Sequence, residues 1–423
     1  MYMRYTLDDV KKSSDRKLFN VVSLFAGGGG SSTGYKLAGG EILLINEFQQ
    51  IAVDTYLENF PDTKTIVGDI REVKGSDILN TTGLDVGELD ILDGSPPCPA
   101  YSQSGTHKGR GGKEEVEITD IFGTKTKIEV RDTKSHAKWD KERSVYGTKQ
   151  KIDDLTMEMA RLIVELQPKV WVCENVKGMT HDDADLQWKR IINELENGIS
   201  PGFYDGTYKI LNAADHGVPQ KRQRVFMVGV REDIMDKVGA TFLNVNSMVF
   251  PDPDRKRPTL RDGIYDLLDD EENMKEAQIL CDDMKTKTKY EWMQLMPKDI
   301  PVEQTYVAVG DYCYAEMERR YKQDPENNPK PKNSHFQSRR TPWDLPSHTL
   351  SETGLQTSLA VHLHPREDRG YTTKEAMRLM TLPEDFKLVG TLNEKLARIG
   401  LMVAPMQMKC IADNIYQQFL KEK

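Results

Sequence analysis

The sequence has few cysteines, no long apolar run and no excess of positive charge. Its five cysteines are scattered over 423 residues without a C-x-x-C pair, which argues against a disulfide framework and a structural zinc site and predicts no bound metal. No stretch approaches the ~20 apolar residues of a membrane-spanning helix. The charged amino terminus lacks the apolar core of a secretory signal. We therefore expect a cytoplasmic protein, in a reducing compartment, with no membrane partner.

The charge balance is acidic. Asp and Glu number 67 against 58 Lys and Arg, which gives a formal net charge of −9. Because phosphate contacts need Lys and Arg, this balance argues against a protein that coats nucleic acid over its whole surface. A local basic cleft remains compatible with it, since local charge governs binding more than the sum does.

The first half of the chain alternates apolar runs with helical segments. Residues 18–26, 41–47, 168–176 and 224–231 have the composition of buried strands, and strands that alternate with helices indicate βαβ units. We predict an α/β fold with a doubly wound, mainly parallel sheet and a second, smaller, loop-rich domain. The first predicted domain comprises residues 1–245, with a long polar insert at 103–151. The second comprises residues 246–370, and a return segment, 371–423, completes the first.

A glycine-rich turn follows the first predicted strand. The stretch "FAGGGGSSTG" (Phe25 to Gly34) allows close backbone approach and opens a helix whose first N–H groups face a ligand. A tight turn without a ligand is the alternative. Glu47 ends the second strand, where an acidic residue binds ribose hydroxyls in such folds, and Asp69 ends the third, placed to reach an adenine amine. Together these strand ends predict an adenosine-shaped pocket.

A cysteine stands between prolines after the fourth strand, in "SPPCPAYSQSG" (Ser95 to Gly105). The prolines make a stiff loop that cannot continue the strand, so Cys98 should lie at the carboxyl edge of the sheet, on the same face as the pocket. We expect a nucleophile there. A buried, inert cysteine is the alternative.

Three further charged residues are candidates for the same crevice. Glu174 ends the strand "VWVCENV", where poor solvation should raise its pKa and let it hold or give a proton. A helix cap or a structural hydrogen bond is the alternative for this carboxylate. Arg222 and Arg224 precede the last strand on alternating faces, and we expect one to contact a ligand and the other a phosphate or a loop. Surface ion pairs are the alternative for the arginines.

Taken in order, these motifs resemble the DNA (cytosine-5)-methyltransferase family of the bacterial and phage type. The resemblance covers nearly the whole chain. Its motifs are "FAGGGGSSTG", "NE" at Asn46–Glu47, "GDI", "GSPPCPAYSQSG", "CENV", "LNAADHGVPQKRQRVFMVGVR", "RPTLRDGI", "YTTKEAMRLMTLPEDF" and "IGLMVAP".

The resemblance implies S-adenosylmethionine (AdoMet) as the cofactor, and a set of residues that bind it. Glu47 would contact the ribose, and Asp69 the adenine. The full set that we expect around the cofactor is Phe25, Ala26, Gly27, Gly29, Gly30, Glu47, Phe48, Asp69, Ile70 and Pro97.

The same resemblance implies the chemistry and the partner. Cys98 would add to C6 of a cytosine that is flipped out of double-stranded DNA, while Glu174 holds N3 and the N4 amine and Arg224 contacts O2. Arg222 completes the expected catalytic set. Residues 246–370 take the place of the family's target-recognition domain, and we expect the enzyme to be a monomer.

The sequence departs from the family pattern at three positions. Pro99 stands where the family usually has Gln, Tyr101 where it has Phe, and Leu401 where it has Asn near the cofactor. Leu401 keeps open a homologue with an altered donor group, or an inactive one that only binds DNA. A tRNA cytosine-5 methyltransferase is a further alternative, which the size of the polar region 246–370 disfavours. A nicotinamide dehydrogenase would explain neither "SPPCP" nor "QKRQR".

Overall fold

The computed structural model divides the chain into two compact units. Unit 1 comprises Met1–Gly68, Leu211–Arg224 and Ser247–Lys423, and unit 2 comprises Asp69–Ile210 and Val225–Asn246. The described residues are 2–97, 113–119, 125–131, 155–176, 181–200, 202–253, 256–287, 290–294, 296–304, 307–308, 318–327, 338–355 and 361–421. Among them, no helix combines the length and the apolar composition that crossing a membrane requires.

The main sheet has seven strands in the order β3-β2-β1-β4-β7-β10-β8. The neighbours β1 and β2, β2 and β3, and β4 and β7 pair in parallel. The predicted fold class, a doubly wound and mainly parallel α/β sheet, is therefore confirmed. The strands are β1 (Phe19–Leu24), β2 (Gly40–Glu47), β3 (Lys64–Val67), β4 (Ile91–Gly94), β7 (Val170–Val176), β8 (Tyr204–Asn212) and β10 (Gln223–Arg231).

The central strands are apolar because helices cover their faces. Every residue of β4, and all but the last of β7, is buried, so neither strand shows the polar alternation of a half-exposed sheet. Each fully buried large aliphatic side chain contributes roughly 1.5–3 kcal/mol to folding. Strand β8 differs, since most of its residues are only partly buried, and the sequence pattern did not predict it.

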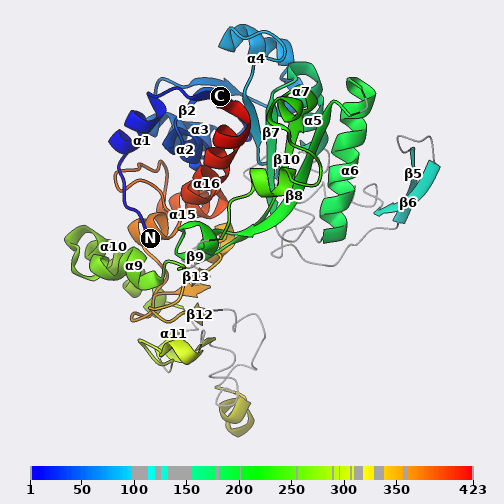
Figure 1. Cartoon of the computed structure of the whole chain (residues 1–423). Helices are drawn as coiled ribbons and strands as arrows, with labels where there is room; N and C mark the ends of the chain where they lie inside the picture. Colours follow the sequence, from blue (N-terminus) through cyan, green and yellow to red (C-terminus); the bar gives the residue numbers. More distant parts are fainter. Residues whose placement is uncertain are drawn as a thin grey trace. The chain divides into compact units, whose positions relative to one another are not determined.

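In unit 1, strands β1 to β3 alternate with helices, and the carboxyl-terminal helix returns to them. Helix α2 packs against α16 (Figure 1). Gly34 lies on the face that the two helices share. A Cβ at Gly34 would lie 2.6 Å from Pro405 O, so only glycine fits there. The helices of this part are α1 (Leu7–Ser14), α2 (Gly30–Leu37), α3 (Gln50–Asn59), α15 (Leu392–Leu401) and α16 (Pro405–Ile415), followed by the π-helix η8 (Tyr416–Leu420).

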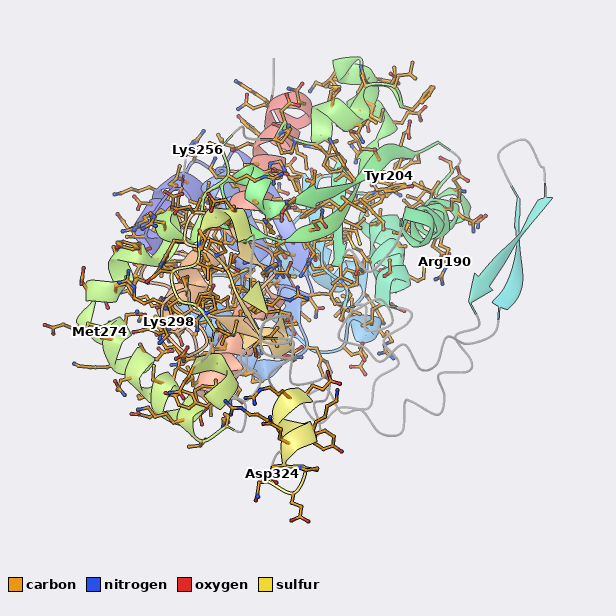
Figure 2. The ribbon with its side chains drawn as sticks, turned by 90° about the horizontal axis from the view of Figure 1, so that it is seen from below. Arg190, Tyr204, Lys256, Met274, Lys298 and Asp324 are labelled. Atoms are coloured by element: carbon orange, nitrogen blue, oxygen red, sulfur yellow. The ribbon has the colours of Figure 1, made fainter. Side chains whose placement is uncertain are left out.

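The remainder of unit 1 is built from short elements. Residues 246–370 have the low regularity that the sequence predicts, with α10 as the longest helix, and Met274 of α10 points outward (Figure 2). The helical elements are η4 (Ala213–His216), α8 (Val245–Val249), α9 (Leu260–Ile264), η5 (Tyr265–Asp269), α10 (Glu271–Lys285), α11 (Tyr290–Gln294), η6 (Val302–Gln304), α13 (Glu352–Leu355) and α14 (Thr373–Leu379). The strands are β9 (Gln220–Lys221), β11 (Val307–Ala308), β12 (Arg339–Arg340), β13 (Ser347–His348) and β14 (His362–Leu363).

Unit 2 carries the other strands of the sheet and their helices. Gly229 of β10 packs against the indole of Trp171 so closely that a Cβ would lie 2.2 Å from the ring. Within the insert at 103–151, β5 and β6 pair antiparallel, two strands that the sequence pattern did not predict. The remaining elements are η1 (Ile70–Glu72), α4 (Gly75–Thr82), β5 (Lys113–Thr119), β6 (Lys125–Arg131), α5 (Leu155–Leu166), α6 (His181–Gly198) and α7 (Glu232–Val238).

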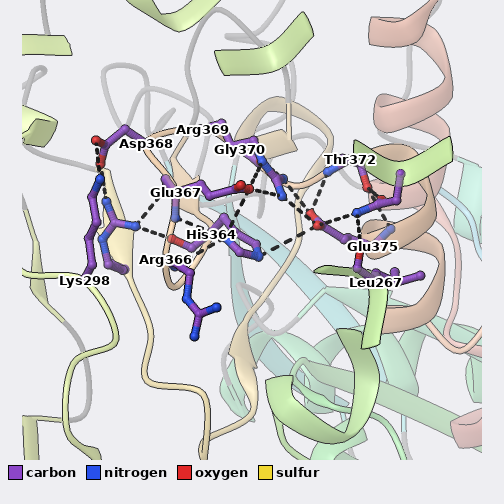
Figure 3. Close-up of polar contacts among 12 residues, drawn as sticks. Leu267, Lys298, His364, Arg366, Glu367, Asp368, Arg369, Gly370, Thr372 and Glu375 are labelled. Atoms are coloured by element: carbon purple, nitrogen blue, oxygen red, sulfur yellow. Dashed lines mark hydrogen bonds and ion pairs between the residues drawn. The ribbon is translucent and has the colours of Figure 1, made fainter. Parts of the chain in front are cut away.

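A buried ionic cluster holds α14 to the rest of unit 1 (Figure 3). The Arg369 guanidinium donates to both carboxylate oxygens of Glu375 at 2.8 Å, and Asn273 of α10 and the Thr372 backbone donate to the same carboxylate. Burial disfavours the charged carboxylate, but Arg369 outweighs this effect and lowers the pKa of Glu375 to about 2. Removing one member of such a pair typically costs about 3–5 kcal/mol.

His364 lies in the same cluster and is uncharged. Its Nδ1 accepts hydrogen bonds from the backbone N–H groups of Arg366 and Glu367 at 3.3 and 3.2 Å. Its ring packs edge-on against Trp343. Burial lowers the pKa of His364 to about 3, and burial likewise lowers the pKa of His362 to about 3. Both imidazoles therefore stay neutral in the fold at pH values where they would be charged in the unfolded chain.

We expect this pair of histidines to make the fold sensitive to mild acid. Below about pH 6.5 the unfolded chain takes up protons on both imidazoles and the folded chain does not, so stability falls as the pH drops from about 6.5 toward 3. At pH 5 the loss is about 2 kcal/mol for each histidine. Glu375 does not contribute between pH 7 and 5, because a carboxylate with a lowered pKa loses its stabilisation only below about pH 4.3. Urea unfolding at pH 7.0, 6.0 and 5.0 measures the slope.

The variant His364→Asn is the matched test, since its Oδ1 can accept the same two backbone N–H groups but does not titrate. Its stability should be lower at pH 7, because packing against Trp343 is lost, and should fall less steeply between pH 6.5 and 5. An unchanged slope would contradict a neutral, buried His364.

Candidate functional site

The turn after β1 has a backbone that few sequences can adopt. Phe25, Gly27 and Gly29 have positive φ angles of 53, 55 and 96°. Glycine reaches this region without steric cost, whereas Phe25 does so with strain of the order of 1–3 kcal/mol. The Gly29 N–H donates to Ala26 O at 3.1 Å and closes the turn, and α2 begins at the next residue. The sequence-predicted loop at residues 25–30 is thus a tight turn that leads directly into a helix.

The carboxylate of Glu47 ties this loop to the end of β2. Its Oε2 accepts the Gly27 N–H at 2.8 Å, and its Oε1 accepts the N–H groups of Phe48 and Gln49 at 2.9 and 2.8 Å. Only 9% of Glu47 is exposed, so charge-assisted hydrogen bonds stabilise a carboxylate that water reaches poorly. The residue therefore fixes both the glycine loop and the start of α3.

The segment between α15 and α16 lies against one side of the glycine loop. A Cβ at Gly30 would lie 2.3 Å from Val403 O and 2.8 Å from Met402 Cβ, so this position excludes any side chain. A Cβ at Gly28 would meet Met402 Cε at 2.2 Å. The backbone positions of residues 402 and 403 thus set where the loop lies.

The opposite side of the loop is open. A Cβ added at Gly27 would have no atom of the described residues within 4 Å, although its neighbours are tightly packed. Close by in the chain, Phe48 exposes 38% of its surface, which is high for an aromatic ring at the end of a buried strand. The open space at Gly27, the fixed Glu47 carboxylate and the exposed Phe48 ring thus belong to neighbouring segments of unit 1, which combine a polar group with an aromatic one.

Two of the predicted cofactor residues begin unit 2. Asp69 caps the short helix η1, and its Oδ1 accepts the backbone N–H of Arg71 at 3.1 Å. Ile70 is buried, and its carbonyl accepts a hydrogen bond from Arg161 of α5 at 3.1 Å. The Arg161 guanidinium also donates to Val73 O at 2.8 Å, so it fixes the backbone that follows Asp69.

The approach to Cys98 lies beside Glu174 in unit 2. In the parallel pair of β4 and β7, Gly94 is the partner of Cys173, so the chains that leave Gly94 and Cys173 run side by side. The Asn175 amide donates to Pro96 O at 3.4 Å and bridges the two segments. Glu174 is 7% exposed at this edge. Cys98, Pro99 and Tyr101 lie outside the described residues.

The two arginines before β10 differ in their surroundings. Arg222 is 2% exposed, and its guanidinium donates to the carbonyls of Leu350, Gly400 and Met402. Arg224 is half-buried and donates to Gln223 O at 2.8 Å. Gln220, the first residue of β9, is buried, and its side chain accepts the Leu350 N–H at 2.9 Å.

The structure therefore brings the predicted residues together in two groups. One group, in unit 1, joins the glycine loop with Glu47 and Phe48. The other, in unit 2, joins the segment before Cys98 with Glu174, and includes the exposed Pro97. Sequence reasoning assigned no role to Gln220, Asn175 or Met402. All three stand within quoted motifs, "QKRQR", "CENV" and "IGLMVAP", which could have drawn attention to them.

Metal ligands do not gather in the described part of the chain. No group of three or more His, Cys, Asp or Glu side chains among these residues is placed to hold an ion.

The chain matches one family model over most of its length. The model, described as C-5 cytosine-specific DNA methylase, matches residues 19–124 and 139–417. These ranges include every residue of the two groups above.

Curated relatives agree with this match, and a solved structure shares the fold. The chain is 29% identical over 390 residues to the type II methyltransferase M.PspPI of Psychrobacter sp. (strain TA137), covering 90% of this chain and 75% of that protein. It is 27% identical over 403 residues to the type II methyltransferase M.Eco47II of Escherichia coli, covering 93% and 77%. A structure from E. coli, described as a DNA modification methyltransferase encoded within a prophage, has a TM-score of 0.57 at 22% identity and covers 95% of this chain and 99% of its own.

We expect Gly27→Ala to weaken cofactor binding while the fold survives. The methyl group would occupy the open face of the glycine loop, and the positive φ would cost about 1–2 kcal/mol. Isothermal titration with AdoMet should show at least about a tenfold loss of affinity for the variant.

Gly83→Ala is the matched control, because Gly83 also has a positive φ and open space around its Cβ position but caps α4 in unit 2. It should lower the melting temperature by a similar amount and leave the affinity for AdoMet unchanged. Equal affinities for the two variants would show that the face at Gly27 is not part of the cofactor site.

Proposed function

The chain belongs to the C-5 cytosine-specific DNA methylase family and is a DNA cytosine-5 methyltransferase, and we propose that it methylates a cytosine of double-stranded DNA with Cys98 as the nucleophile. The observation that supports this assignment most directly is the pairing of β4 with β7, which brings the segment before Cys98 alongside Glu174. A nucleophile and an acid that act on one base must both lie within reach of it, and neighbouring strand ends place them close together.

The chemistry of cytosine explains why a thiol is needed. C5 of the ring is a poor nucleophile and does not attack a methyl group unaided. Addition of the Cys98 thiolate to C6 converts the ring into an enamine whose C5 can attack. A base then removes the C5 proton, and β-elimination releases Cys98 and restores the aromatic ring.

Glu174, in its protonated form, supplies a hydrogen-bond donor for N3, and Arg224 supplies the positive charge that this addition requires. Negative charge develops on N3 and O2 as the thiolate adds to C6. We assign Glu174, buried beside the approach to Cys98, to N3 and the N4 amine. We assign the contact with O2 to Arg224 and not to Arg222, because three backbone carbonyls already accept hydrogen bonds from Arg222.

The described residues fit an adenosyl cofactor. The open face at Gly27 admits a ligand against bare backbone, Glu47 offers a fixed carboxylate to ribose hydroxyls, and the exposed Phe48 ring offers a stacking surface. AdoMet, when bound, supplies an electrophilic methyl group. The remaining residues proposed to hold it are Phe25, Ala26, Gly29, Gly30, Asp69, Ile70 and Pro97.

We propose duplex DNA as the substrate. In a duplex the target atoms of the cytosine, C5 and C6, are buried in the base stack. The cytosine must therefore leave the helix before Cys98 can reach C6, at a cost of a few kcal/mol. We propose that residues 246–370 recognise the target sequence, that the insert at 103–151 adds DNA contacts, and that the enzyme acts as a cytoplasmic monomer. Because M.PspPI and M.Eco47II are named type II methyltransferases, we also propose a role in DNA modification.

Replacing the nucleophile should separate catalysis from cofactor binding. We expect Cys98→Ser to lose methyl transfer by at least about a thousandfold, because a serine hydroxyl is not ionised at neutral pH, and to bind AdoMet as tightly as the wild type does. Transfer of tritium from labelled AdoMet to duplex DNA measures the first quantity, and isothermal titration the second.

Cys281→Ser is the control, since Cys281 is also a free thiol but lies on α10, where burial raises its pKa. It should methylate at the wild-type rate. Full activity of Cys98→Ser would contradict the assigned nucleophile. If the wild-type protein transferred tritium to tRNA and not to DNA, this result would instead show the tRNA-specific activity.

A further inference from the structure

The guanidinium of Arg222 is buried and bound to the main chain. Its Nη1 donates to Leu350 O at 2.8 Å, and its Nη2 donates to Gly400 O at 3.1 Å and to Met402 O at 2.8 Å. Only 2% of the residue is exposed. A side chain that is held in this way cannot also reach a base or a phosphate.

Two of the three carbonyls belong to the end of helix α15. The last carbonyls of a helix have no partner within it, and a cation at this end interacts favourably with the helix dipole. Gly400 lies in the last turn of α15, and Met402 is its C-cap residue. Arg222 therefore caps α15 from a segment that lies 178 residues earlier in the chain.

The third carbonyl, that of Leu350, lies two residues after strand β13, which is itself fixed. Ser347–His348 of β13 pair in parallel with Gln220–Lys221 of β9. The Gln220 side chain accepts the Leu350 N–H while Arg222 donates to Leu350 O, so both polar groups of this residue are bound. Gln220 and Arg222 of the motif "QKR" thus bind the backbone of Leu350 through its N–H and its carbonyl, which leaves Arg222 little freedom to move.

The segment that Arg222 holds is the one that lies against the glycine loop. Gly30 has no room for a Cβ because Val403 O and Met402 Cβ lie at 2.3 and 2.8 Å from that position. Gly400, at the other end of the segment, is packed as tightly against the backbone of Ser351 and Glu352. A shift of residues 400–403 would therefore move the glycine loop with them.

We propose that Arg222 is a positioning residue for the cofactor, which acts by clamping residues 400–402 so that the glycine loop keeps the geometry that AdoMet requires. This inference rests on the proposed function, since it takes the glycine loop as the AdoMet site. The planar fork of arginine matters here, because it presents donors in two directions to three carbonyls. A lysine ammonium has neither this span nor this fixed geometry.

Arg222→Met and Arg222→Lys test the clamp. Isothermal titration without DNA should show that Arg222→Met binds AdoMet at least about tenfold more weakly than the wild type, with Arg222→Lys between the two. In methylation assays the KM for AdoMet should rise, while kcat at saturating AdoMet falls less than about threefold.

Arg231→Met is the matched control. Arg231 also donates to two backbone carbonyls, those of Gly87 and Gln167, but it does so in unit 2. Its loss should lower the melting temperature and leave the affinity for AdoMet within about twofold of the wild type. A comparable loss of affinity in Arg231→Met would reduce the effect of Arg222 to general destabilisation and overturn the inference.

The remaining outcomes also decide. Wild-type affinity with a low kcat in Arg222→Met would place Arg222 in catalysis and overturn its positioning role. If Arg222→Met does not fold, Gly400→Ala provides a second test, because it displaces the same segment while Arg222 is kept. This variant should also bind AdoMet more weakly than the wild type. Unchanged affinity in Gly400→Ala would overturn the inference. A wild-type protein or Cys98→Ser variant that bound no AdoMet would overturn the proposed cofactor and the clamp with it.

Discussion

The arrangement of the site in unit 1 depends on one carboxylate. Glu47 accepts three backbone N–H groups, one from the glycine loop and two from the start of α3. A neutral or shorter side chain would leave these donors without a partner in a place that water reaches poorly, at a cost of about 1–3 kcal/mol each. The strained turn at Phe25 persists because this carboxylate and the segment after α15 hold it from two sides.

Polar groups specify the rest of unit 1 in the same way. The described elements between residues 246 and 370 are short, and buried charges add to the contacts of their buried apolar side chains. Arg369 with Glu375, and Arg340 with Asp368 at 2.7 Å, fix loops whose side chains could not define one conformation by packing alone. Such clusters stabilise only when every member is satisfied, so they make a loop-rich region definite without making it strongly stable.

The sequence predicted the features that depend on near neighbours. Apolar runs that end in glycine, proline or acid located β1, β2, β4, β7 and β10, and the same boundaries located Glu47 and Glu174. Strand β8 was missed because most of its residues are only partly buried and form no continuous apolar run. The bonds of Arg222 could not be predicted, because their acceptors lie 128, 178 and 180 residues further along the chain. No spacing or periodicity encodes such a contact.

The packing of α2 on α16 constrains how the protein can be synthesised. The glycine face of α2 is covered by residues that the ribosome adds roughly 370 positions later, about 20–75 s at ordinary rates of translation. During that interval α2 lacks the helix that packs against it. The early part of unit 1 therefore reaches its final packing only after residues 402–409 have been added, so its folding is coupled to a segment that is distant in the sequence.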